Sequence, residues 1–186
     1  MPVERAEVIR VLREHGLTGA AAAEAWTTAR ELVRDTRRRG IEHAATLDAD
    51  DGRPIGPVLT GSTSSTDLTP HIERFARGRR YVQIHTHPRS TSFSNLDLLI
   101  LGSHPSVRAM AVVGVDGAWH VVSRLVETRM ENSRALFDGF LQELTRLTRE
   151  HVPEAERPHA AMLRVAARHN LRYDREMGPA DERPHP

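Results

Sequence analysis

The chain has 186 residues, no cysteine and a formal net charge of +1 at pH 7. The absence of cysteine excludes disulfides and a thiolate metal site, and the near-neutral charge gives no overall electrostatic case for binding nucleic acid. No run approaches the roughly 18 apolar residues of a membrane span, and the N-terminus lacks the apolar core of a signal peptide. We therefore expect a cytoplasmic protein with one domain, appended segments and no membrane partner.

The first 40 residues predict two helices. Residues 3–15 have the apolar spacing of an amphipathic helix, which Gly16 ends. A longer helix is predicted to follow from Thr18, a good N-cap, to about Arg38, and its alanine-rich start favours helix formation. Gly40 then ends this second helix.

Turn residues between strand-forming segments predict a sheet in the middle of the chain. Asp50-Asp51-Gly52 separates the first two predicted strands, and Asp116-Gly117 separates the last two. This pattern indicates an α/β fold in which helices flank a mixed β-sheet, with added helices at both termini. In chain order the predicted elements are strands 42–48 and 56–61, a helix at 69–77, strand 81–87, a helix from residue 94, and strands 109–115 and 118–123.

The segment His85-Thr86-His87-Pro88 predicts a metal site at the end of a strand. The preceding residues, Tyr81 to Ile84, are aromatic, β-branched or apolar, apart from one glutamine. Because successive strand side chains alternate between faces, His85 and His87 share one face. Pro88 cannot donate to the ladder and therefore ends the strand.

Ser94 and Asp97 complete the predicted site. Ser94 is a good N-cap for the apolar helix that follows, and Asp97 falls in the first helical turn, where the helix dipole stabilises a carboxylate. Two imidazoles and one carboxylate, with a fourth position open to water, are the donor set of a catalytic zinc site. An isolated pair of histidines arises easily by chance among the 11 in this chain. The combination of H-x-H-P with S-x-x-D at a strand-to-helix junction favours a metal site over a chance pair.

Residues 85–97 resemble the motif of the JAMM (MPN-type) metalloprotease family, in which a distant glutamate precedes H-[S/T]-H-P and then S-x-x-D. Residues 41–62 also resemble the strand–turn–strand that opens JAMM-fold domains of the bacterial RadC type. The resemblance implies a sandwich of the cytidine-deaminase type. It divides the chain into N-terminal helices (1–40), a metallohydrolase core (41–123), a C-terminal helical extension (124–172) and a disordered tail (173–186).

The resemblance also assigns roles to individual residues. It implies that His85, His87 and Asp97 ligate Zn²⁺, that Ser94 helps to hold the oxyanion of the tetrahedral intermediate, and that Glu42 is the general base. Glu73 is the alternative base, although its place in the predicted helix 69–77 favours a surface position. The chain departs from the family pattern at one point, since six residues separate His87 from Ser94 where the family usually has seven, and the glycine often found there is absent.

The C-terminal segment predicts two further helices, at about 127–151 and 159–171. The first carries an apolar stripe, which we expect to pack on the domain; a homodimer seam is the alternative. The stripe consists of Met130, Leu136, Phe137, Phe140, Leu141, Leu144 and Leu147.

Two functions fit the sequence. The first is zinc-dependent hydrolysis of peptide or isopeptide bonds in a peptide or modifier-protein substrate. A structural zinc would normally be closed by a fourth protein ligand, so the open donor set favours this function. The second is a non-catalytic RadC-like or effector-associated module that binds protein or DNA. The shorter loop between His87 and Ser94 favours this second function slightly, since a displaced Asp97 would weaken metal binding.

Overall fold

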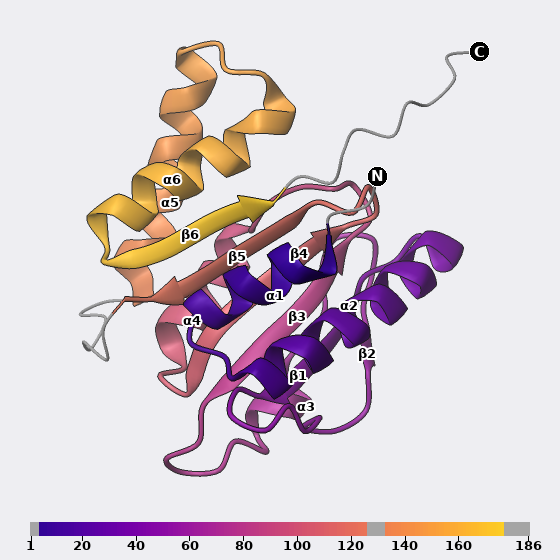
Figure 1. The fold of residues 1–186 in the computed structure, drawn as a ribbon. Coiled ribbons are helices and arrows are strands. Elements are labelled where there is room, and N and C mark those ends of the chain that lie inside the picture. The colour runs from indigo at the N-terminus through magenta and orange to yellow at the C-terminus, as the bar shows by residue number, and fades with distance from the viewer. Residues whose placement is uncertain (1–3, 126–132, 177–186) are drawn as a thin grey trace.

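The computed structural model describes residues 4–125 and 133–176, which form one sheet with helices on both of its faces (Figure 1). The strands are β1 (His43–Asp48), β2 (Leu59–Thr60), β3 (Tyr81–His87), β4 (Val107–Gly114), β5 (Trp119–Arg124) and β6 (Leu171–Glu176). Their order in the sheet is β2-β1-β3-β4-β5-β6, and among these strands β3 and β4 are the one parallel pair. The predicted α/β fold with a mixed, helix-flanked sheet is confirmed.

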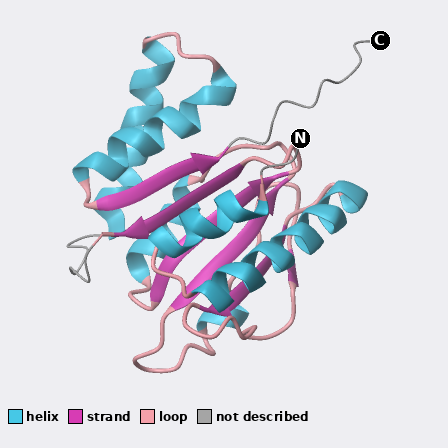
Figure 2. Cartoon of the chain, in the orientation of Figure 1, coloured by secondary structure: helices cyan, strands magenta, loops and turns pink. Residues whose placement is uncertain are grey.

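The helices divide between the two faces of the sheet, as the cartoon shows (Figure 2). On one face lie α1 (Arg5–Glu14) and α2 (Gly19–Arg39). On the other face lie α4 (Asn95–Ser103), α5 (Ser133–Arg149) and α6 (Arg157–Arg168). The remaining helical segments are the short α3 (Thr69–Ile72) and a 3₁₀ turn, η1 (Glu154–Glu156).

The two N-terminal helices begin and end close to the predicted positions. The Thr18 side chain accepts a hydrogen bond from the Ala21 backbone N–H at 3.2 Å, which caps the start of α2. Gly40 has a φ of 70°, the left-handed conformation that ends many helices. Apolar residues of α1 and α2 pack on alternate strand residues such as Val82 and Ile84 and so form the first core.

The opposite face of β3 is where the motif histidines lie. Because side chains alternate along a strand, Gln83, His85 and His87 point away from the first core. The second core on this face is built from β4, β5 and the helices α4, α5 and α6, with Phe93 and Leu98 beside the motif. The two cores therefore sandwich the sheet, and β3 presents its histidines to the second.

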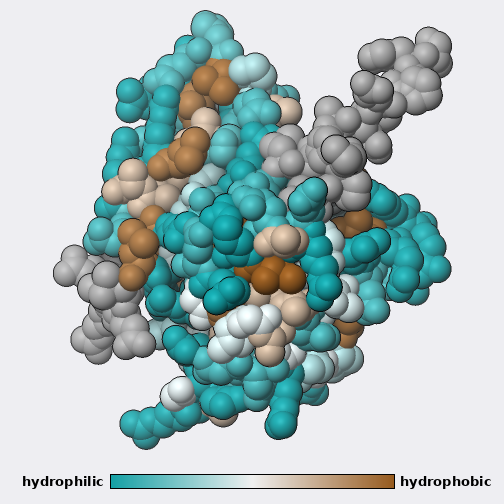
Figure 3. All heavy atoms as spheres, viewed as in Figure 1, coloured by the Kyte–Doolittle hydropathy of each residue, from teal (hydrophilic) through white to brown (hydrophobic). Residues whose placement is uncertain are grey.

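The C-terminal segment is part of this sandwich. Leu136, Phe140 and Leu147, from the predicted apolar stripe, are buried in the second core, as expected for a stripe that packs on the domain. Met130 lies outside the described residues. Leu141 remains 39% exposed, and Figure 3 shows hydrophobic residues over the α5 and α6 region. The homodimer through this helix stays a prediction.

Two boundaries near the C-terminus were predicted wrongly. The helix expected at 159–171 ends at Arg168, and residues 171–176 form β6, which pairs antiparallel with β5. Residues 173–176 are therefore strand and not the start of a disordered tail; the rest of that predicted tail lies outside the described residues. The segment Leu171–Glu176 alternates Leu, Tyr and charged residues, so pairing through its backbone outweighs its polar composition.

Two other elements are shorter than expected. The strand predicted at 56–61 pairs only over Leu59–Thr60, and the helix predicted at 69–77 is α-helical over Thr69–Ile72. The start of the helix predicted at 127–151 falls partly outside the described residues. Among the helices of the described ranges, none combines the length and the apolar character that crossing a membrane requires.

Candidate metal centre

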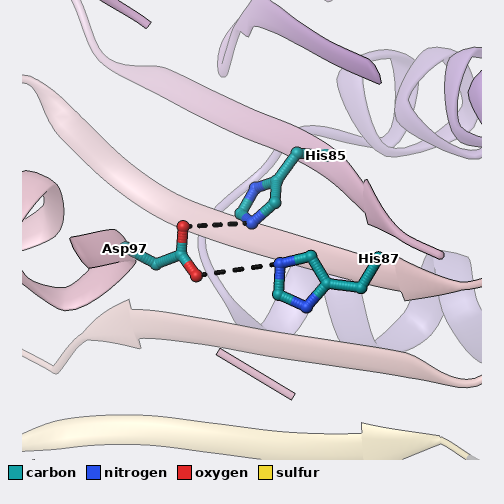
Figure 4. A group of neighbouring side chains, drawn as sticks. All are labelled: His85, His87 and Asp97. Atoms are coloured by element: carbon teal, nitrogen blue, oxygen red, sulfur yellow. Dashed lines mark ion pairs between the residues drawn. The ribbon is translucent and has the colours of Figure 1, made fainter. Parts of the chain in front are cut away.

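Three side chains from two rigid elements converge at the end of β3 (Figure 4). His85 and His87 come from the last residues of the strand, and Asp97 comes from the first turn of α4. Asp97 Oδ1 lies 3.1 Å from His85 Nε2, and Asp97 Oδ2 lies 3.9 Å from His87 Nε2. One ligand atom from each residue lies within 4.8 Å of the other two, and all three residues are buried. A metal ion could be held between them.

A capping box at the start of α4 fixes the carboxylate. The Ser94 backbone N–H and the Ser94 hydroxyl each donate to Asp97 Oδ2 at 2.7 Å, and the Asp97 N–H donates back to Ser94 Oγ at 3.3 Å. The same residue pair therefore starts the helix and orients the carboxylate. With Oδ2 held in this way, Oδ1 is directed toward His85.

A backbone carbonyl sets the protonation of His87. His87 Nδ1 lies 3.0 Å from both the carbonyl oxygen and the hydroxyl oxygen of Thr91. Because a carbonyl only accepts, Nδ1 carries the proton and Nε2 presents its lone pair toward Asp97. This is the outer contact that metal-ligating histidines usually make.

His85 has no such partner among the described residues. Both ring nitrogens are buried without a hydrogen bond, and the 3.1 Å approach of Nε2 to Asp97 lacks hydrogen-bond alignment. A buried imidazole nitrogen left unpartnered costs free energy of about 1–3 kcal/mol. The chemistry of the donors, two imidazoles and one carboxylate, fits a divalent metal, which would satisfy that nitrogen.

Glu42 lies beside the three converging residues without being one of them. It immediately precedes β1, is 5% exposed, and its Oε1 is 3.8 Å from His87 Nε2. Its backbone is held on both sides, because the Glu42 N–H donates to Ser62 O at 2.7 Å and its carbonyl accepts from Gly61 N at 2.9 Å. A Cβ at Gly61 would collide with the Ser65 carbonyl oxygen, so this close turn requires glycine.

Burial and mutual charge shift the protonation of the whole group. Burial raises the pKa of Glu42 to about 7, near the value that suits a general base at neutral pH. Burial and the charge on His85 lower the pKa of His87 to about 4. Burial opposes ionisation of both His85 and Asp97, but their mutual attraction outweighs it, raising the pKa of His85 and lowering that of Asp97.

The residues proposed from the sequence come together in space. Glu42, His85, His87, Ser94 and Asp97 form one cluster. Glu42 lies 43 positions before His85, and the antiparallel pairing of β1 with β3 brings the two together. The six-residue loop before Ser94 does not displace Asp97, because the carboxylate reaches His85. The alternative base, Glu73, is exposed on the surface, as its place in the predicted helix led us to expect.

Sequence reasoning missed the residues that support the cluster. Thr91 holds His87, and a second group around Tyr173, His120 and His159 lies further along the same face of the sheet. None of these residues has ligand spacing, and the position of His120 beside Tyr173 follows from the pairing of β5 with β6. Comparison of the chain with protein-family models, with curated proteins and with solved structures found no match.

Proposed function

We propose that the protein is a zinc-dependent hydrolase of peptide or isopeptide bonds, of the JAMM type, acting in the cytoplasm on a peptide or modifier-protein substrate. The observation that carries the proposal is the convergence of His85, His87 and Asp97 with a buried carboxylate, Glu42, beside them. That arrangement separates three donors for a metal from one group for proton transfer. The motif resemblance supports the same division of roles.

The donor set favours zinc over other biological metals. Two neutral imidazoles and a carboxylate suit a tetrahedral ion with one position open, whereas calcium and magnesium prefer oxygen donors throughout. When bound, zinc supplies a Lewis acid that polarises a carbonyl group and makes a water molecule more acidic. No fourth His, Cys, Asp or Glu joins the three donors within residues 4–125 and 133–176.

Within this proposal each protein group has a defined task. Glu42 accepts a proton from the attacking water on its carboxylate and passes that proton to the leaving nitrogen. Its raised pKa suits both steps. Thr91 keeps the proton of His87 on Nδ1, so that Nε2 can ligate the metal. Ser94 orients Asp97 through its hydroxyl. An oxyanion contact from the same hydroxyl would require Ser94 to release Asp97 Oδ2.

Substitution of the base tests the proposal. We expect purified wild-type protein to carry about one zinc per chain and to cleave members of a fluorogenic peptide library or an isopeptide-linked fluorogenic lysine substrate. Glu42→Gln should keep the zinc and lose at least about 100-fold in turnover, because it cannot take the proton. Glu73→Gln, an exposed glutamate changed in the same way, should match the wild type.

The outcomes separate the two candidate functions. Cleavage that survives Glu42→Gln would show that Glu42 is not the base. Loss of zinc in Glu42→Gln would make Glu42 a fourth ligand and the site a closed structural one. Zinc-loaded wild-type protein that cleaves none of these substrates would favour the non-catalytic interaction module.

A further inference from the structure

A second polar cluster lies on the same face of the sheet as the metal centre. The Tyr173 hydroxyl is 2.9 Å from His120 Nδ1, 2.8 Å from His159 Nδ1 and 3.0 Å from Ser92 Oγ. His120 is 2% exposed and its ring stacks on that of Tyr173. The four residues come from β5, α6, the loop before α4, and β6, so one phenol oxygen joins four separate parts of the chain.

Strand pairing places this cluster next to the metal ligands. His85 on β3 lies opposite Val112 on β4, and Val112 lies opposite His120 on β5. Residues opposite one another in a sheet point to the same face, so His120 is two strands from His85 on the ligand side. Neighbouring strands are roughly 4.8 Å apart, which puts the two histidines about 10 Å from each other.

The number of protons in the cluster restricts its hydrogen bonds. A phenol oxygen donates one hydrogen bond and accepts two. Of its three partners, therefore, only one can act as acceptor, and at least one histidine must donate from Nδ1. Burial lowers the pKa of both His120 and His159, which favours neutral rings with one proton each. The Tyr173 oxygen is then fully used, and it ties Ser92 firmly to β6.

Ser92 is directly attached to the residue that sets the protonation of His87. The carbonyl of Thr91, its chain neighbour, accepts the hydrogen bond from His87 Nδ1–H, and Ser92 itself is 4% exposed. Residues 88–94 contain no helix or strand of their own. Phe93 anchors this loop in the second core, where its ring meets that of Tyr173 edge-on, and the Ser90 N–H donates to the His87 carbonyl at 3.0 Å. The rest of its position depends on two side-chain contacts: Ser92 with Tyr173, and the Ser90 hydroxyl, which accepts from the Asp116 N–H at 3.1 Å.

We propose that Tyr173, on the last described strand, is a positioning residue of the metal centre, acting through Ser92 and Thr91 on the ring of His87. This inference rests on the proposed function only in requiring that His85, His87 and Asp97 bind a metal. It adds a segment outside the predicted metallohydrolase core, residues 41–123, to the working parts of the site. Removing the hydroxyl should loosen the loop and weaken metal binding.

Tyr173→Phe is the direct test, because it removes one oxygen and keeps the ring. We expect zinc affinity, measured by competition with a chromophoric chelator, to fall about tenfold, at the lower end of the 10–100-fold loss usual for outer contacts of a metal ligand. Tyr81→Phe is the matched control: the Tyr81 hydroxyl accepts from the Ala76 N–H at 2.7 Å, away from the ligands. It should leave zinc affinity unchanged.

Two further readouts separate positioning from a general loss of stability. In metal-free protein, ¹⁵N chemical shifts of His87 should show the Nδ1 proton less strongly fixed in Tyr173→Phe than in Tyr81→Phe. Ser92→Ala should weaken zinc binding to the same extent, and the double variant should show no additional loss, since both changes break one connection.

The results would distinguish this inference from the proposed function. If Tyr173→Phe and Tyr81→Phe both bind zinc with the affinity of the wild type, the role proposed for Tyr173 is overturned. The hydrolase proposal would still stand. Independent, additive losses in Ser92→Ala and Tyr173→Phe would also overturn it. Wild-type protein that binds no zinc would overturn the metal centre and this inference together.

Discussion

Two buried histidines, each paired with an aspartate, lie on opposite faces of the sheet and differ in how completely their hydrogen bonds are made. His15, at the end of α1, has Nε2 at 2.8 Å from Asp174 Oδ2 and Nδ1 at 2.8 Å from Ser123 Oγ. His85 has Nε2 at 3.1 Å from Asp97 Oδ1, but neither of its ring nitrogens forms a hydrogen bond. The first pair is complete within the chain, and the second is not.

The difference shows how to recognise a site when residue types alone mislead. Ser123, His15 and Asp174 are the residue types of a serine hydrolase triad, and a neutral His15 that donates to Asp174 must accept from Ser123. Yet Ser123 is 2% exposed and His15 is fully buried, so no substrate reaches the hydroxyl. This group ties α1 to β5 and β6. The unsatisfied nitrogens of His85, beside two further donors, mark the group that is open to a ligand, and the residue types alone do not.

The largest expected effect is the loss of metal from one pair and not from the other. His85→Ala should reduce zinc from about one per chain to near zero by mass spectrometry, because it removes one of three donors. His15→Ala should keep full stoichiometry. Adding zinc at about 100 times its Kd should stabilise the wild type by about 2.7 kcal/mol and raise its Tm by roughly 5–10 °C.

That thermal shift should be absent from His85→Ala and present in His15→Ala. If His15→Ala lost its zinc while remaining folded, the two pairs would be coupled and the comparison would fail. A zinc-dependent shift that persists in His85→Ala would place the metal elsewhere in the chain.

The next effect is on the free energy of unfolding of the metal-free protein. Here the pair of His15 with Asp174 matters more than the pair of His85 with Asp97. In metal-free protein His15→Ala should cost about 2–4 kcal/mol, since it leaves the buried Ser123 hydroxyl without its partner, weakens the hold on Asp174 and opens a cavity. Chemical denaturation would measure this loss. His169→Ala, at a partly exposed histidine after α6, is the control and should cost well under 1 kcal/mol.

The pair of His15 with Asp174 also predicts that the stability of the protein depends on pH. Burial lowers the pKa of His15 from its ordinary 6.5 to about 4, while Asp174 partly opposes this and Arg172 adds to it. The unfolded chain then takes up the proton first, so the stabilising contribution is complete above pH 6.5 and is lost as the pH falls toward 4. The wild type should lose stability more steeply than His15→Ala over that interval, and equal slopes would contradict a buried, neutral His15.

The smallest effect concerns the capping box. Ser94→Ala should destabilise the metal-free protein by about 1 kcal/mol, the usual cost of an N-cap, and should weaken zinc binding by freeing Asp97. Thr18→Ala removes the N-cap of α2 and should cost a similar amount without changing zinc affinity. Equal zinc affinity in both variants would show that the helix end holds Asp97 without Ser94.

Local patterns predicted much of the site. The strand through His85 and His87 and the helix that Ser94 caps each depend on a few adjacent residues, and both formed as expected. Gly40 ended its helix for the same local reason. Glu42 was different, because its approach to His87 depends on the pairing of β1 with β3. Its place came from family resemblance and not from spacing.

The parts that escaped prediction depend on contacts between distant segments. Leu171–Glu176 carries four charged residues in six positions, a composition that suggests a solvated tail and not a strand. Only the presence of β5 as a neighbour makes it the edge of the sheet. Tyr173 and His15 were missed for the same reason, since the partners His120 and Asp174 lie 53 and 159 residues away along the chain.

Successive residues of β6 serve opposite faces of the sheet: Tyr173 contacts Ser92 on one face, and Asp174 contacts His15 on the other. During synthesis, therefore, α1 leaves the ribosome about 160 residues before the strand that completes its histidine pair. The nascent chain can form β1 to β5 and their helices before β6 is made. Until then, His15 lacks Asp174 and Ser92 lacks Tyr173. A protease that cuts between α6 and β6 would release this strand and disturb both groups at once.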